Sequence, residues 1–204
     1  MLKVFTLSGY EGVGKSTLIN HFQKNNDFKV IPETARLILP LQDTVLRDSK
    51  DDLSYKSFIS YLTNMHFMLS NHMSFNVISD RNLVDSLTYL KMYSKEQSIG
   101  LVETGDFIER FLEEYNREYL YNETVLIKHP ENDSHILENI LSDPERVYGK
   151  NVSQYKRDAQ NWEEIYISIA EYLNTRGLSK KLTITNCYIE NVNITHNLEK
   201  LFNA

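Results

Sequence analysis

The feature that most constrains the fold is a glycine-rich segment close to the N-terminus. It matches the spacing G-x-x-x-x-G-K-[ST] at every position and reads Gly9-Tyr10-Glu11-Gly12-Val13-Gly14-Lys15-Ser16. Glycines let successive backbone N–H groups turn towards one anion, and the N-terminus of a following helix adds partial positive charge. Of the seven glycines in the chain, three fall within six positions of this segment, which favours a phosphate-binding loop over an accidental glycine-rich turn.

The loop predicts specific roles for its residues. We expect Lys15 to reach the β- and γ-phosphates of a nucleotide and Ser16 to ligate Mg²⁺. The sequence lacks an Asn-Lys-x-Asp guanine-reading motif, so ATP is the expected donor, although GTP stays open. For Tyr10, stacking on a base and covering the loop both stay open. The residues expected to bind the nucleotide are Gly9, Gly12, Val13, Gly14, Lys15, Ser16 and Thr17.

Short apolar runs alternate with helix-length segments along the chain, which is typical of a parallel α/β sheet. We therefore predict an α/β protein with the three-layer P-loop NTPase fold, in which helices cover both faces of a five-stranded parallel sheet. A single domain is expected over residues 1–204, with helices over 15–24, 53–73 and 152–173 and a lid over about 130–158. The expected strands are Lys3–Leu7, Lys29–Pro32, Phe75–Ser79, Thr124–Lys128 and Leu182–Thr185.

Glu33 and Arg36 follow the second expected strand. Ligands of an open parallel sheet bind just outside the carboxyl ends of its strands. A carboxylate there can take a proton from an acceptor hydroxyl, and a guanidinium can hold an anionic substrate. We therefore predict that Glu33 is a catalytic, substrate-binding base and that Arg36 binds substrate. The alternative is an ordinary surface ion pair.

The third expected strand leads into Asp80 and Arg81. An apolar strand that ends in Asp fits the carboxylate that supports Mg²⁺ in P-loop enzymes, so Asp80 and Ser16 are the predicted metal ligands. Arg81 is expected to point into the same cleft as a catalytic and substrate-binding residue. Asp85, one turn into the next helix, is a further predicted substrate contact. Alternatively Asp80 caps that helix, a role that is compatible with metal binding.

A basic segment follows the fourth expected strand and would supply the lid. Phosphoryl transfer needs positive charge over the γ-phosphate, often from a segment that closes over the site and excludes water. We predict Arg146 as a catalytic cation, and Lys150, Lys156 and Arg157 are further candidates. The alternative is a solvated, charged helix face, and the sequence does not decide which lid cation acts.

Residues 1 to about 95 resemble the deoxynucleoside kinase and thymidylate kinase group of P-loop enzymes. The wider P-loop AAA-type group that includes ribosylnicotinamide kinases is similar at the same points. The resemblance rests on the phosphate loop, on Glu33 and on Asp80-Arg81-Asn82. It implies that Glu33 is the base for a sugar hydroxyl, as in deoxynucleoside kinases, and that Arg81 binds substrate phosphate, as in thymidylate kinases. The chain departs from the deoxynucleoside kinase pattern at Ile59, where those enzymes place a base-reading Gln.

The leading hypothesis is a Mg-ATP-dependent kinase of a nucleoside or nucleotide. A second is a kinase for a hydroxyl of another nucleoside-like group, such as ribosylnicotinamide or a hydroxymethylated base in DNA. A third is a nucleotide-dependent switch that acts through a protein partner. The net charge of −6 does not favour nucleic acid as a partner, although a local basic groove stays open. No apolar run reaches membrane-spanning length, so we expect a cytoplasmic protein, with acceptor and oligomeric state undetermined.

Overall fold

A computed structural model describes residues 3–10, 12–25, 29–33, 76–96, 121–128, 152–177, 179–186 and 200. These residues form five strands and three helices. The strands are β1 (Val4–Ser8), β2 (Lys29–Ile31), β3 (Val77–Asp80), β4 (Tyr121–Lys128) and β5 (Ser179–Asn186). The helices are α1 (Lys15–Asn25), α5 (Leu83–Glu96) and α8 (Val152–Thr175).

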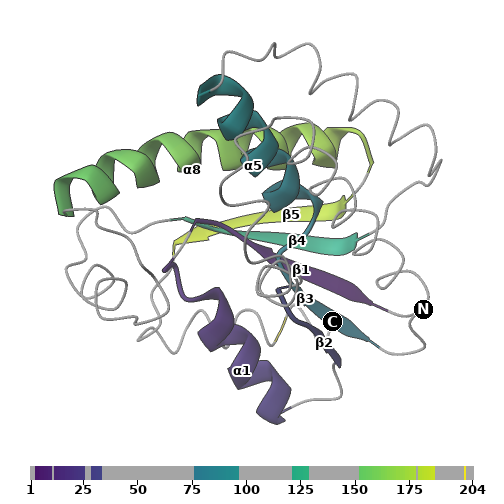
Figure 1. Ribbon diagram of the computed structural model, residues 1–204. Helices are drawn as coiled ribbons and strands as arrows, with labels where there is room; N and C mark the ends of the chain where they lie inside the picture. The colour runs from purple at the N-terminus through teal and green to yellow at the C-terminus, as the bar shows by residue number, and fades with distance from the viewer. Residues whose placement is uncertain are drawn as a thin grey trace, which may run out of the picture.

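The five strands form one sheet in the order β2-β3-β1-β4-β5, and every pairing in it is parallel. Helix α1 lies on one face of the sheet, whereas α5 and α8 lie on the other (Figure 1). The predicted three-layer α/β fold with a five-stranded parallel sheet is therefore confirmed. The central strand β1 is buried along its whole length, as expected for a parallel strand that is covered on both faces.

Apolar periodicity explains how the helices are placed. Helix α1 packs on β2 and β3, and α8 packs on α5, β4 and β5. The buried side chains of α8 recur at three- and four-residue spacing, which gives one apolar stripe towards the sheet. They are Ala159, Tyr166, Ile169, Ala170 and Leu173. The helix ends before Gly177, whose φ of 78° is typical of a helix C-terminus.

Two strands are longer than the sequence predicted. Strand β4 begins at Tyr121 and β5 at Ser179, and these two residues are paired partners in the sheet. Polar residues such as Asn122 and Lys181 weaken the apolar signal there, whereas pairing with a neighbouring strand depends on the backbone. The helix expected over residues 53–73 lies outside the described residues.

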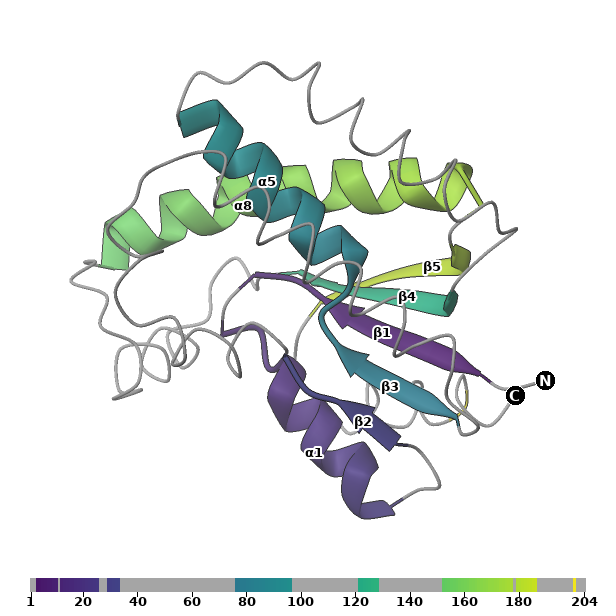
Figure 2. The same ribbon diagram turned by 45° about the vertical axis from the view of Figure 1, so that its right-hand side comes forward.

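The arrangement brings the strand ends to one edge. The arrowheads of β1 and β3 point to the side where α1 and α5 begin (Figure 2). Because Leu7 of β1 is opposite Asp80 of β3, the residues that follow both strands meet at this edge. None of the helices in the described part of the chain is both long and apolar enough to cross a membrane.

Candidate active site

The loop between β1 and α1 has the backbone that its glycines allow. Gly9 has a φ of 140°, and a Cβ atom added to it would lie 2.4 Å from the carbonyl oxygen of Ile127. Gly12 and Gly14 also have positive φ values, of 77° and 87°. A side chain at position 9 would therefore clash with the end of β4, so the first glycine of the motif is required by packing as well as by conformation.

Lys15 begins helix α1 and turns back into the loop. Its Nζ atom donates hydrogen bonds to the carbonyl oxygens of Gly9, at 2.6 Å, and Tyr10, at 2.8 Å. The side chain is buried. Burial, together with the positive charge of Arg81, lowers the pKa of Lys15 to about 8. The ammonium group is thus placed inside the loop, where a bound anion would offset the cost of burying its charge.

Ser16 and Asp80, the predicted metal ligands, lie next to each other. The Ser16 hydroxyl donates to Oδ2 of Asp80 at 3.3 Å, and Oδ1 of Asp80 is buried with no hydrogen-bond partner among the described residues. Burial raises the pKa of Asp80, and the charges of Lys15 and Arg81 oppose this rise. Neighbouring ligands in an octahedral Mg²⁺ shell lie about 3 Å apart, so these two oxygens fit that ion.

The described residues contain no group of three or more His, Cys, Asp or Glu side chains that could hold a metal ion. In phosphate-loop proteins Mg²⁺ is held by few protein groups and keeps water and phosphate oxygens in its other positions. Ser16 and Asp80 stay the predicted metal ligands.

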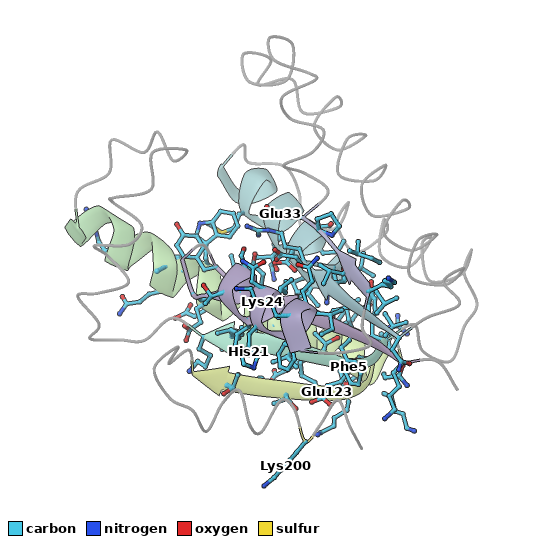
Figure 3. All side chains as sticks on the ribbon, turned by 90° about the horizontal axis from the view of Figure 1, so that it is seen from below. Phe5, His21, Lys24, Glu33, Glu123 and Lys200 are labelled. Atoms are coloured by element: carbon cyan, nitrogen blue, oxygen red, sulfur yellow. The ribbon has the colours of Figure 1, made fainter. Side chains whose placement is uncertain are left out.

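Arg81 connects the ends of β2 and β3. Its Nε atom lies 2.6 Å from Oε1 of Glu33, and its Nη1 atom lies 3.5 Å from Oδ1 of Asp85. Figure 3 shows Glu33 beside α5, apart from His21 and Lys24 on α1. Arg81 has a φ of 74°, a left-handed conformation that residues other than glycine rarely adopt. Such backbone is retained where surrounding contacts fix it, often at functional sites.

The start of α5 binds one carboxylate oxygen of Asp85. Asn82 caps the helix, since its Oδ1 accepts from the backbone N–H of Val84 at 2.7 Å, and its own N–H donates to Oδ2 of Asp85 at 3.0 Å. This reciprocal arrangement is a capping box. The Ser8 hydroxyl also lies 2.7 Å from Oδ2 of Asp85. The helix cap is therefore Asn82, and the alternative in which Asp80 is the cap is wrong.

Helix α8 contacts both the loop and the Arg81 cluster. The ring centroids of Tyr10 and Trp162 are 5.4 Å apart, and the Tyr166 hydroxyl donates to Oδ1 of Asp85 at 3.0 Å. Tyr10 is only 4% exposed. Its ring therefore packs against α8 in this structure, and the two roles left open for Tyr10 both stay predictions.

The structure thus brings Lys15, Ser16, Glu33, Asp80 and Arg81 to one edge of the sheet. The buried Val13 belongs to the loop, and the exposed Thr17 follows Ser16 in α1. Arg36 and Arg146 lie outside the described residues, as does the expected lid up to position 151. In the described part of that lid, Arg157 is exposed on α8.

Sequence reasoning missed Ser8, Asn82 and Tyr166. The spacing Asn82-x-x-Asp85 is a helix-start signal that the sequence does contain. Tyr166 carries no such signal, because its partner Asp85 lies 81 positions away.

Comparison with known proteins identifies a matching family and structures with a similar fold. The family model described as an AAA domain matches residues 4–166. No curated protein sequence matches the chain. A structure of deoxyadenosine kinase from M. mycoides with the products dCMP and a flexible dCDP bound is 12% identical, with a TM-score of 0.67 and 98% of each chain covered.

Two further structures have the same fold. The M. mycoides enzyme with bound dATP is 12% identical, with a TM-score of 0.57, covering 98% of this chain and 100% of that one. The NadR protein in complex with NR is 14% identical, with a TM-score of 0.64, covering 100% of this chain and 52% of that one. The predicted resemblance to P-loop nucleoside kinases is therefore confirmed at the level of the fold.

Proposed function

The chain belongs to the AAA domain family, and from this premise we propose that it is a Mg-ATP-dependent kinase that phosphorylates a hydroxyl group of a nucleoside. One observation carries the proposal. The carboxylate of Glu33 lies against Arg81 at the carboxyl edge of the sheet, next to a complete phosphate loop. A site that only bound a nucleotide would need the loop but would have no use for a carboxylate and a guanidinium beside it.

The phosphate loop supports the donor half of this proposal. Lys15 donates to two neutral carbonyl oxygens, and the charged oxygens of a triphosphate would be stronger acceptors. Ser16 and Asp80 would hold Mg²⁺, which when bound neutralises charge on the phosphates. The loop glycines would expose their N–H groups to the same anion. ATP is the proposed donor.

Glu33 and Arg81 support the acceptor half. A hydroxyl nucleophile gains from a positioned carboxylate that takes its proton. A phosphate nucleophile already bears charge and would be repelled by that carboxylate. Arg81 would orient Glu33 through the 2.6 Å ion pair and would contact an anionic group of the acceptor or product. A nucleoside is therefore favoured over a nucleotide as the acceptor.

The fold comparison supports this acceptor class. Deoxyadenosine kinase has been solved with dCMP as a product, and this chain shares its fold. A second candidate acceptor is ribosylnicotinamide, which the likeness to the NadR complex with NR favours. Both candidates present a sugar hydroxyl, so Glu33 would act in the same way on either.

The experiment is a transfer assay with γ-labelled ATP and Mg²⁺. The acceptors are deoxynucleosides, ribonucleosides, ribosylnicotinamide, nucleoside monophosphates and duplex DNA. We expect label on a nucleoside and none with Lys15→Ala, because that variant loses the charge inside the phosphate loop. Label on monophosphates alone would contradict the hydroxyl-kinase proposal. Hydrolysis of ATP without label on any acceptor would favour a nucleotide-dependent switch.

A further inference from the structure

We infer that Tyr166 of α8 is a positioning residue for Arg81, acting through the carboxylate of Asp85. The expected effect on kcat rests on the proposed function. The expected effect on the position of Arg81 rests on geometry alone. Tyr166 stands 81 positions from Asp85 in sequence, yet its hydroxyl donates to Oδ1 of Asp85 at 3.0 Å. Both residues are almost completely buried, with 1% of Tyr166 and 2% of Asp85 exposed.

The two oxygens of Asp85 have different partners. Oδ2 lies within hydrogen-bond distance of the Ser8 hydroxyl and the Asn82 backbone N–H, at 2.7 and 3.0 Å. Oδ1 receives the Tyr166 hydroxyl at 3.0 Å and lies 3.5 Å from Nη1 of Arg81. The strand end and the helix cap therefore anchor one oxygen, whereas α8 anchors the oxygen that faces Arg81.

This arrangement matters because the contact between Arg81 and Asp85 is long. At 3.5 Å it is at the limit of a hydrogen bond, so a small rotation of the carboxylate would change it. The Tyr166 hydroxyl opposes such a rotation. Arg81 in turn contacts Glu33 through its Nε atom. Removing the Tyr166 hydroxyl would thus loosen the Arg81 guanidinium through Asp85.

A second contact of α8 supports the same role. Trp162 is one turn before Tyr166 on the same helix face, and it packs against Tyr10 in the phosphate loop. The rings of Trp162 and Tyr166 are 6.3 Å apart. One face of α8 therefore contacts the donor loop through Trp162 and the acceptor cluster through Tyr166, and the helix fixes the two halves of the site relative to each other.

The test compares Tyr166→Phe with Tyr172→Phe in the full chain. The control removes the same hydroxyl from the same helix, about 9 Å further along its axis, where that group accepts from Arg176 at 3.2 Å. The first readout does not need activity. It is the rate of hydrogen exchange of the Arg81 Nε–H with water, measured by NMR and assigned with Arg81→Lys. We expect exchange at least about 10-fold faster in Tyr166→Phe and unchanged in Tyr172→Phe.

The second readout is kinetic. With the acceptor found by the transfer assay, Tyr166→Phe should lower kcat about 10-fold and leave the Kd for ATP within about twofold of the parent value. In an Asp85→Asn background, Tyr166→Phe should cause no further loss, because the residues act as one unit. Unchanged Arg81 exchange in Tyr166→Phe would overturn the inference even if the parent is a nucleoside kinase. Failure of every acceptor would instead overturn the proposed function, and the NMR comparison would still decide the role of Tyr166.

Discussion

The Nε atom of Arg81 lies 2.6 Å from Oε1 of Glu33, so an ion pair joins the residues that follow β2 and β3. Both side chains are 13% exposed. Arg81 adopts a φ of 74°, and its backbone N–H donates to the carbonyl oxygen of Leu7 at 2.9 Å. The fold itself therefore holds this ion pair in place, and in the proposed function a pair held in this way reduces the ordering that substrate binding requires.

Arg81→Ala should impair use of the acceptor and leave ATP binding nearly unchanged. The guanidinium contacts Glu33 and Asp85, which form the proposed acceptor side. We expect a rise in KM for the acceptor or a fall in kcat of about 10-fold or more, with the Kd for ATP within about threefold. Lys24→Ala, which removes an exposed cation from α1, is the control. A selective loss of ATP affinity would place Arg81 in the donor half of the site.

Asp80→Asn should uncouple metal use from nucleotide binding. The variant keeps the size of the side chain but loses the charge that would hold Mg²⁺ beside Ser16. Turnover at saturating ATP should fall by at least about 10²-fold, whereas ATP binding in the presence of a chelator should change little. The measurement is calorimetry with and without Mg²⁺, together with kcat. Equal losses of metal-dependent activity and metal-free binding would mean that Asp80 is structural.

Gly9→Ala should damage the phosphate loop directly. The added Cβ would lie 2.4 Å from the carbonyl oxygen of Ile127, and φ is 140° at this position. We expect a loss of about 1–3 kcal/mol in the free energy of unfolding and ATP binding weakened at least about 10-fold. Gly177→Ala, at the end of α8 with a φ of 78°, is the matched control. The Gly177→Ala protein should lose stability and keep its ATP affinity. Normal ATP affinity in the Gly9→Ala protein would contradict the loop geometry.

Lys15 should give the nucleotide-free protein a specific pH dependence. Its pKa is about 8 in the fold and 10.5 as the reference value. Between these pH values the unfolded chain binds more protons at Lys15 than the folded chain does, so stability should rise with pH across this window. The rise is on the order of 1–3 kcal/mol and should be absent in Lys15→Met. Urea unfolding of both proteins from pH 7.5 to 10.5 measures this rise. If the free energy of unfolding changed with pH equally in both proteins, the lowered pKa of the buried Lys15 would be contradicted.

The residues of the donor loop could be predicted from sequence because their chemistry is local. The motif fixes Lys15 and Ser16 at adjacent positions. The glycines around them indicate a backbone that turns its N–H groups towards an anion. Glu33 and Asp80 could also be placed, since parallel strands carry the residues after them to one edge. The distance between Glu33 and Arg81 required the structure, because it depends on the side-chain directions that the left-handed backbone at Arg81 sets.

Contacts between residues far apart in the sequence could not be predicted from it. Tyr166 lies on the buried face of α8 and is 1% exposed. Its hydroxyl has a further partner, Asp85, and no spacing rule connects two helices at that separation. The spacing of Asn82 and Asp85 is that of a capping box, and it favours Asn82 over Asp80 as the helix cap.

The most direct test of the central claim is the kcat of Glu33→Gln for the acceptor that the transfer assay identifies. Gln keeps the shape of the side chain but cannot take a proton, and general-base catalysis typically contributes about 10² to 10⁴-fold. Glu163→Gln is the matched control, because its carboxylate is also paired with a cation, Lys128 at 3.2 Å, and belongs to α8 rather than to the pair with Arg81. We predict that Glu33→Gln lowers kcat by at least about 10²-fold, changes the acceptor KM much less, and that Glu163→Gln keeps the parent kcat. Near-full kcat in Glu33→Gln would contradict the hydroxyl-kinase account.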